Sequence, residues 1–215
     1  MRQNGGRSPV IVTALDGISF EIKDGDRVGL VGHNGAGKTT LLRTIAGVYP
    51  PINGKVKIDG KISALFNQQL GIDMDESGID NIRSVGLYLG LSPSEIESKI
   101  DNIVEFSELK EFVSLPVRTY STGMLTRLSF SIATSFKPDI LLIDEGIGSG
   151  DARFEERARA RVKEFMNNSS IIVLASHSQA MVQQMCNKAM LLEHGKLVAF
   201  SDVDSIFKLY SERSV

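Results

Sequence analysis

The stretch that decides the fold is Gly32-His33-Asn34-Gly35-Ala36-Gly37-Lys38-Thr39. It fits the phosphate-loop pattern G-x-x-x-x-G-K-[ST] at every fixed position. In such loops glycines let backbone N–H groups turn inward around phosphate oxygens, while the lysine reaches the β- and γ-phosphates and the hydroxyl ligates Mg²⁺. The sequence therefore predicts a site for a nucleoside triphosphate and Mg²⁺. The residues expected to contact the nucleotide are Gly32, His33, Asn34, Gly35, Ala36, Gly37, Lys38, Thr39 and Thr40, with Thr39 also a metal ligand.

The flanking sequence predicts the α/β class. Residues 27–31 form a short apolar run typical of a buried strand, and residues 40–46 have helical character. A helix that begins at the loop directs its N-terminus toward the phosphates. Further apolar runs at 139–143 and 170–175 alternate with helical segments, which is the pattern of a mainly parallel sheet flanked by helices.

Two other parts interrupt that pattern. Turn signals such as Asn53-Gly54 join short apolar segments, which predicts an antiparallel β part. These segments are 10–13, 18–22, 55–58 and 62–66. Helical periodicity over 79–113 indicates an inserted helical subdomain. We predict one domain over 1–215, with a nucleotide-binding core at about 10–78 and 114–215 and with 1–9 disordered.

Composition limits the other possibilities. The 42% hydrophobic content is enough for a full core, and the formal net charge of −2 shows no overall basic character for nucleic acid binding. The single cysteine, Cys186, excludes an internal disulfide, and we assign it no role. The longest apolar runs fall far short of the ~20 residues that span a bilayer.

A second motif ends the apolar run at 139–143 with the acids Asp144 and Glu145. A pair of acids after a strand is usually a solvated turn. Here a phosphate loop lies upstream, and a strand buried on both faces would carry Asp144 to the sheet edge beside that loop, where it can hold Mg²⁺. Glu145 would then lie where it can orient and deprotonate an attacking water.

A third motif, Tyr120-Ser121-Thr122-Gly123-Met124, precedes an amphipathic helix. Alone it would be ordinary helix capping. In its position upstream of Asp144 and Glu145, it makes the chain resemble the ATP-binding-cassette ATPases over nearly its whole length. The resemblance implies that Ser121 and Gly123 correspond to the signature motif, which closes on the γ-phosphate of ATP bound to a second copy, giving a two-fold dimer.

The resemblance implies further site residues. Asp151 corresponds to the D-loop aspartate, although Gly148-Ser149-Gly150 departs from the usual Ser-Ala-Leu. His177, after a predicted strand, corresponds to the switch histidine. In the Q-loop region, counting back from Asn81 favours Gln68 over Gln69 as the residue that contacts the metal and the catalytic site.

Within that family, the variant motifs resemble the ATPase subunits that export lipid-linked O-antigen, capsule or teichoic-acid polysaccharide. This implies an integral-membrane permease as partner, a lipid-linked glycan as transported substrate, no nucleic acid, and a peripheral position on the cytoplasmic face of the inner membrane. An importer or drug-exporter ATPase shares the same catalytic residues and stays an alternative. A soluble cassette ATPase acting on nucleic acid or translation fits less well, because those proteins usually carry two ATPase domains or long coiled coils. A P-loop small-molecule kinase would leave Tyr120 to Met124 and His177 unexplained.

One segment differs in charge from the rest of the chain. Residues 73–111 hold ten acids and three bases, a net charge of −7, against −2 for the whole chain. Most charge runs are solvated faces. This run coincides with the segment that, in the resembled family, receives the permease, and cytoplasmic loops of membrane proteins are enriched in Lys and Arg. We therefore expect an acidic docking surface.

Overall fold

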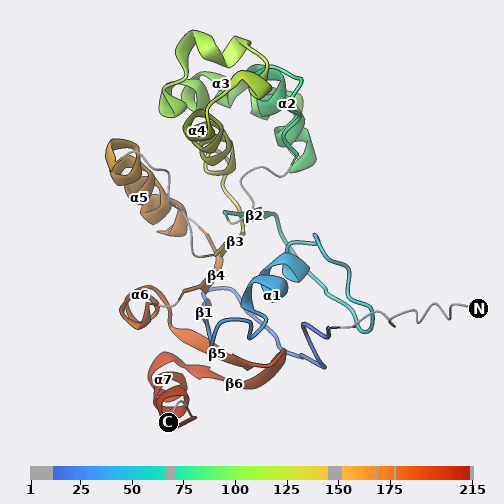
Figure 1. Cartoon of the computed structure of the whole chain (residues 1–215), viewed down its shortest axis with the longest axis vertical. Helices are drawn as coiled ribbons and strands as arrows, with labels where there is room; N and C mark the ends of the chain where they lie inside the picture. Colours follow the sequence, from blue (N-terminus) through green and yellow to red (C-terminus); the bar gives the residue numbers. More distant parts are fainter. Residues whose placement is uncertain (1–11, 66–70, 145–151, 168, 177, 214–215) are drawn as a thin grey trace, which may run out of the picture.

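The computed structural model describes residues 12–65, 71–144, 152–167, 169–176 and 178–213 (Figure 1). The prediction of disorder at 1–9 lies outside these residues. Among the residues described, no helix is both long and apolar enough to cross a membrane.

Six strands form one sheet in the order β2-β3-β4-β1-β5-β6. The strands are β1 (Arg27–Val31), β2 (Ile62–Ala64), β3 (Ile140–Ile143), β4 (Ile171–Ala175), β5 (Lys188–Glu193) and β6 (Lys196–Asp202). Every neighbouring pair is parallel except β5 and β6, so the predicted mainly parallel sheet is confirmed.

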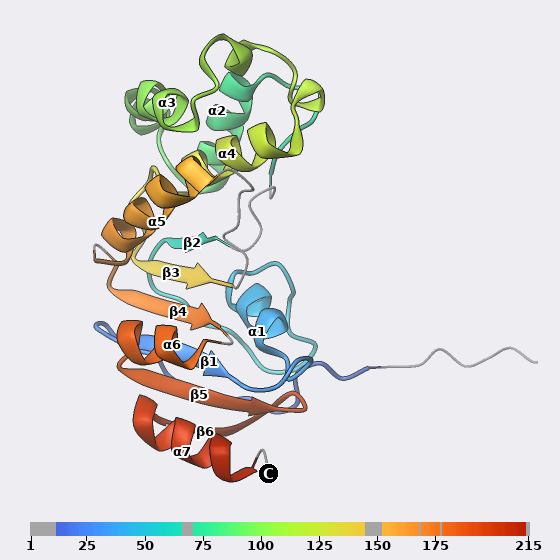
Figure 2. The same ribbon diagram turned by 60° about the vertical axis from the view of Figure 1, so that its left-hand side comes forward.

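Helices cover both faces of this sheet (Figures 1 and 2). Helix α1 (Lys38–Ile45) packs on one face, where alternate strand residues such as Val28 and Leu30 meet it. The opposite face is covered by α5 (Ala152–Asn167), α6 (Gln179–Met185) and α7 (Val203–Arg213). The central strands are thus buried on both faces, which explains why they read as continuous apolar runs.

The antiparallel part differs from the prediction. In the described residues, 12–22 and 55–58 contain no strand, and Ile62–Ala64 pairs parallel to β3. The carbonyl of Lys61 accepts hydrogen bonds from the N–H groups of Asp139 and Ile140, which joins β2 to the sheet edge. The turn signals suggested local hairpins, but pairing beside a buried strand decided the arrangement instead. The antiparallel pair is β5 and β6.

A helical part lies at one end of the molecule, opposite α7 (Figure 2). It comprises α2 (Gly78–Tyr88), α3 (Pro93–Ser107) and α4 (Thr122–Ala133), with short 3₁₀ turns η1 (Lys110–Ser114) and η2 (Val117–Thr119). Serines cap all three α-helices: Ser77, Ser92 and Ser121. Their shared apolar cluster runs from Ile82 to Phe136, so α4, which lies beyond the predicted boundary at 113, packs with this part.

Two arginines of α5 join the sheet region to the helical part. The guanidinium groups of Arg157 and Arg161 lie 4.7 and 4.1 Å from the ring centre of Phe106, at the end of α3. Arg161 also donates to Asn102 Oδ1 at 2.9 Å and to Ser135 Oγ at 3.1 Å. Burial lowers the pKa of Arg161, and a partly desolvated cation interacts more strongly with an aromatic ring.

A buried acid ties the start of β1 to β5. Asp26 is 7% exposed, and its carboxylate lies 2.8 Å from Lys188 Nζ. The backbone N–H of Lys23 also donates to it, at 3.0 Å. Burial raises the pKa of Asp26, but the hydrogen bonds and charges of Lys188 and Lys23 outweigh that effect, so its pKa lies below the ordinary 3.8.

Candidate nucleotide-binding site

The glycine loop lies between the end of β1 and the start of α1. Gly35 and Gly37 have φ of 80° and 107°, values that L-residues with a Cβ rarely adopt. Gly37 is the N-cap of α1 and supplies no side-chain cap to that helix. The first N–H groups of α1 are therefore left for an anion, as in other phosphate sites at helix N-termini.

The lysine of the motif lies across this loop. Lys38 is 8% exposed, and its Nζ donates to the carbonyls of Gly32 at 2.7 Å and His33 at 3.2 Å. These are the first two residues of the loop. The fold therefore holds the Lys38 ammonium group inside the loop in which phosphate oxygens are expected. This group can exchange its bonds to the two carbonyls for bonds to phosphate oxygens.

The structure brings together two of the predicted metal ligands. Thr39 Oγ1, on α1, donates a hydrogen bond to Asp144 Oδ2, just after β3, at 2.7 Å. Mg²⁺ prefers such oxygen ligands and is usually held by one or two carboxylates together with phosphates and water. Among the described residues, no group of three or more His, Cys, Asp or Glu side chains could hold a metal ion.

The predicted signature residues lie in the helical part, away from α1 (Figure 1). Ser121 is the N-cap of α4, and its Oγ accepts a hydrogen bond from the Met124 N–H at 3.2 Å. Ser121 and Gly123 are exposed. The start of α4 is thus a helix N-terminus open to another molecule. Four other predicted site residues lie outside the described residues: Gln68, Glu145, Asp151 and His177.

Sequence reasoning missed a group of residues that contacts the loop. The turn between β5 and β6, His194-Gly195, donates a hydrogen bond from the Gly195 N–H to the Ala36 carbonyl at 3.0 Å. The ring of His194 lies 4.7 Å from that of His33, centre to centre. A glycine between two apolar strands signals the turn, but nothing in the sequence signals its contact with a loop about 160 residues upstream.

The sequence profile of the ABC transporter family matches residues 15–148. The O-antigen export system ATP-binding protein RfbE of Yersinia enterocolitica is 50% identical over 195 residues, covering 90% of this chain and 82% of that protein. The teichoic acids export ATP-binding protein TagH of Lactococcus lactis is 40% identical over 93% of this chain. The chain spans only 42% of that TagH protein.

Solved structures share the fold. The ATP-binding subunit of an ABC transporter superposes with a TM-score of 0.73 at 23% identity, covering 94% of this chain and 89% of that chain. A dimeric ATP-binding cassette in a post-hydrolysis state bound to ADP and Pi gives 0.70 at 20% identity, covering 92% and 94%. The resemblance to cassette ATPases of the polysaccharide-exporting branch is confirmed. The chain belongs to the ABC transporter family, as one of its ATP-hydrolysing subunits.

Proposed function

We propose that this ATPase subunit powers the export of a lipid-linked polysaccharide across the cytoplasmic membrane. The observation that carries the proposal is the 50% identity, over 90% of the chain, to an O-antigen export ATP-binding protein. A teichoic acids export protein at 40% identity adds support. In this proposal the chain binds an integral-membrane permease at the cytoplasmic face of the inner membrane, and the glycan is the transported substrate.

In this proposal, side chains of the phosphate loop and of neighbouring segments hold the phosphates and the metal. Lys38 turns from the Gly32 and His33 carbonyls to the β- and γ-phosphates, and the N-terminus of α1 receives the phosphate charge. Thr39 and Asp144, whose Oγ1 and Oδ2 atoms lie 2.7 Å apart, would hold Mg²⁺ together with Gln68. When bound, Mg²⁺ neutralises the charge that develops on the transferring phosphoryl group.

We assign the chemical step to residues after Asp144. Glu145 follows directly in the sequence and accepts the proton of the attacking water. His177 senses the γ-phosphate, and Asp151 completes the contact between two copies. These three roles rest on the family motifs.

A second copy of the chain completes the site in this proposal. Ser121 and Gly123 are exposed at the N-terminus of α4, in the helical part rather than beside their own phosphate loop. The positive end of a helix dipole attracts an anion. The start of α4 therefore closes on the γ-phosphate held by the partner copy, and two such sites form in a two-fold dimer.

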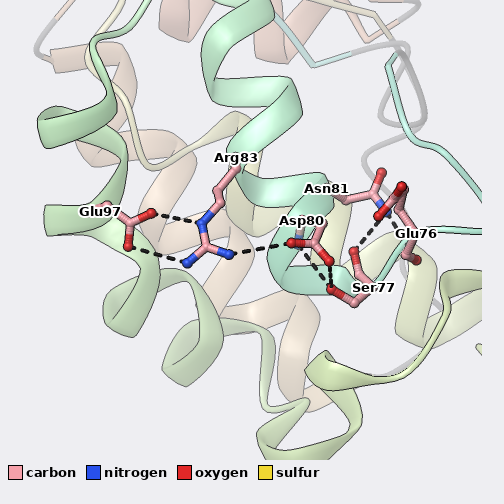
Figure 3. A network of polar contacts seen from close by, with 6 residues as sticks. All are labelled: Glu76, Ser77, Asp80, Asn81, Arg83 and Glu97. Atoms are coloured by element: carbon pink, nitrogen blue, oxygen red, sulfur yellow. Dashed lines mark hydrogen bonds and ion pairs between the residues drawn. The ribbon is translucent and has the colours of Figure 1, made fainter.

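The permease docks, in this proposal, on the acidic loop that precedes α2. Asn81 is fully buried and holds this loop from inside: its Nδ2 donates to the Asp73 and Ser77 carbonyls at 2.8 and 2.9 Å. Its Oδ1 accepts from the Asp73 N–H at 2.7 Å. Helix α2, which follows the loop, is linked to α3 by Arg83, whose guanidinium donates hydrogen bonds to Glu97 of α3 and to Asp80 of α2 (Figure 3).

The acidic side chains of this loop lie at the surface. Asp73, Asp75 and Glu76 are exposed, on a backbone that Asn81 holds in one shape. Asp75 also pairs with Arg118, and the loop keeps a net negative charge. A partner segment rich in Lys and Arg meets the opposite charge there, which speeds association.

The decisive experiment is co-purification of this chain with an integral-membrane permease from its own host, followed by mass spectrometry of bound lipids. The expected result is a complex that holds a lipid-linked glycan and consumes ATP faster when that glycan is added. A complex that retains no glycolipid and moves a small solute instead would contradict polysaccharide export and favour the importer or drug-exporter alternative.

A further inference from the structure

We propose that the turn between β5 and β6 is a positioning element for the phosphate-binding loop, with Gly195 as the positioning residue. The proposal rests on the assignment of Gly32 to Thr39 as the nucleotide loop. In this proposal, Gly195, which is distant from the loop in sequence, helps to set the geometry of that loop.

The backbone conformation of the turn is that of a tight two-residue hairpin. His194 and Gly195 have φ of 47° and 78°, the two consecutive positive values that a two-residue type I′ hairpin turn requires. Both main-chain groups of Gly195 are bonded to other segments. Its N–H donates to the Ala36 carbonyl at 3.0 Å, and its carbonyl accepts from the Asp16 N–H at 2.7 Å.

The bond to Ala36 orients a donor of the loop. Because the peptide unit is planar and trans, the Ala36 carbonyl and the Gly37 N–H point in opposite directions. Holding that carbonyl on Gly195 therefore turns the Gly37 N–H away from the hairpin. Gly37 precedes Lys38 in the loop, where backbone N–H groups are expected to meet phosphate oxygens.

The start of the loop rests on the same hairpin. A Cβ at Gly32 would lie 2.2 Å from the carbonyl oxygen of Leu192, the second-last residue of β5. One residue on, the rings of His33 and His194 lie 4.7 Å apart with an interplanar angle of 52°. The hairpin end thus contacts both the first residues of the loop and Ala36 near its end.

The turn is itself held from two sides. Arg213 of α7 donates to both carboxylate oxygens of Glu193, each at 2.9 Å. On the other side, Lys196 lies 3.3 Å from the Asp16 carboxylate. A Cβ at Gly195 would lie 2.7 Å from the Ala14 carbonyl oxygen, and the same oxygen is 2.8 Å from the position of a Cβ at Gly37. A side chain at position 195 would therefore displace the backbone at Ala14, which also contacts the phosphate loop at Gly37.

The test replaces Gly195 by Ala and by Asn and measures the affinity for a fluorescent ATP analogue and the rise in melting temperature that Mg·ATP produces. A matched control is Gly90, which has φ of 77° but no heavy atom within 4 Å of its Cβ position. Both sites would place an L-residue at nearly the same positive φ, 78° at Gly195 and 77° at Gly90. We expect affinity to fall about tenfold for Gly195→Ala, because small misplacements in a site are costly, and to change little for Gly90→Ala.

The Gly195→Asn variant separates the effect of the added Cβ from the effect of backbone strain. Asn tolerates a positive φ better than Ala but keeps the Cβ that meets Ala14. Gly195→Asn should therefore stay defective in nucleotide binding. Binding restored to wild-type affinity in Gly195→Asn would show that strain alone was responsible and would overturn the proposal.

Lys38→Ala, measured in parallel, tests the nucleotide site itself. If Lys38→Ala binds nucleotide as the wild type does, the site assignment fails. If it loses binding while Gly195→Ala keeps wild-type affinity, only the positioning proposal is overturned.

Should the Gly195 variants not fold, His194→Asn keeps the turn and removes the ring contact with His33. An affinity reduced about threefold would support the proposal, and unchanged affinity would refute it.

Discussion

Two residues far apart in sequence form one hydrogen bond in the candidate site: Thr39 and Asp144, at 2.7 Å. We predict that Asp144→Asn lowers Mg²⁺-dependent ATP hydrolysis about 10²-fold, because an amide carries no negative charge for the metal. Steady-state ATPase assays across a Mg²⁺ titration measure the effect. Asp101→Asn, on the exposed side of α3, is the control and should leave the rate unchanged. Equal rates for the two variants would remove Asp144 from the metal site.

At the scale of elements, Asp26 links the start of β1 to Lys188 of β5. Its folded-state pKa lies below its ordinary value, so its stabilising effect is present above about pH 4 and is lost as pH falls through the folded-state pKa. We predict that Asp26→Asn lowers the free energy of unfolding by about 1 to 3 kcal/mol at pH 7. The difference from wild type should shrink by pH 3 in urea melts. A difference that is the same at both pH values would contradict this account.

The joint between α5 and the helical part gives a second prediction at this scale. Arg161→Ala removes the stacking on Phe106 and the hydrogen bonds to Asn102 and Ser135. We expect a loss of about 1 to 3 kcal/mol in the free energy of unfolding. Arg118→Ala is the control, because Arg118 forms an exposed ion pair with Asp75, and such pairs contribute ~0 to 1 kcal/mol. Equal losses in thermal melts of the two variants would show that the joint does not stabilise the fold.

At the scale of the whole molecule, the two halves of the proposed site lie on different copies. Lys38→Ala should abolish ATP binding, whereas Ser121→Arg should leave binding by the single chain intact and block dimer closure. Nucleotide titration and light scattering with ATP measure the two effects. Ser92→Arg is the control, since Ser92 caps α3 as Ser121 caps α4. Full ATPase activity of Ser121→Arg in the assembled transporter would exclude the shared site.

The acidic loop makes a prediction at the same scale. Reversal of Asp73, Asp75 and Glu76 to Lys should weaken co-purification of the permease, most strongly at low ionic strength, where charges are least screened. ATP binding by the free subunit should not change. The control reverses three exposed acids outside segment 73–111, which are Asp24, Asp59 and Glu212. Undiminished complex formation by the first variant at low salt would refute the docking surface.

The sequence by itself determined the phosphate loop, the strand before it, the helix after it and the branch of the family. Each of these depends on residues within a short stretch: the glycines, Lys38 and Thr39 act through their own backbone geometry and spacing. Segment 18–22 is not the predicted strand, but its side chains Ile18, Phe20 and Ile22 pack on the core.

The tertiary structure alone decided which segments meet. Local turn signals suggested an antiparallel part, yet Ile62–Ala64 joined β3 in parallel, because burial beside that strand outweighs a local hairpin preference. The contact between Gly195 and Ala36 exists because β1 and β5 are neighbours in the sheet, with Val31 opposite Leu191. Strand order depends on how the whole core packs, so no motif in either segment announces that contact.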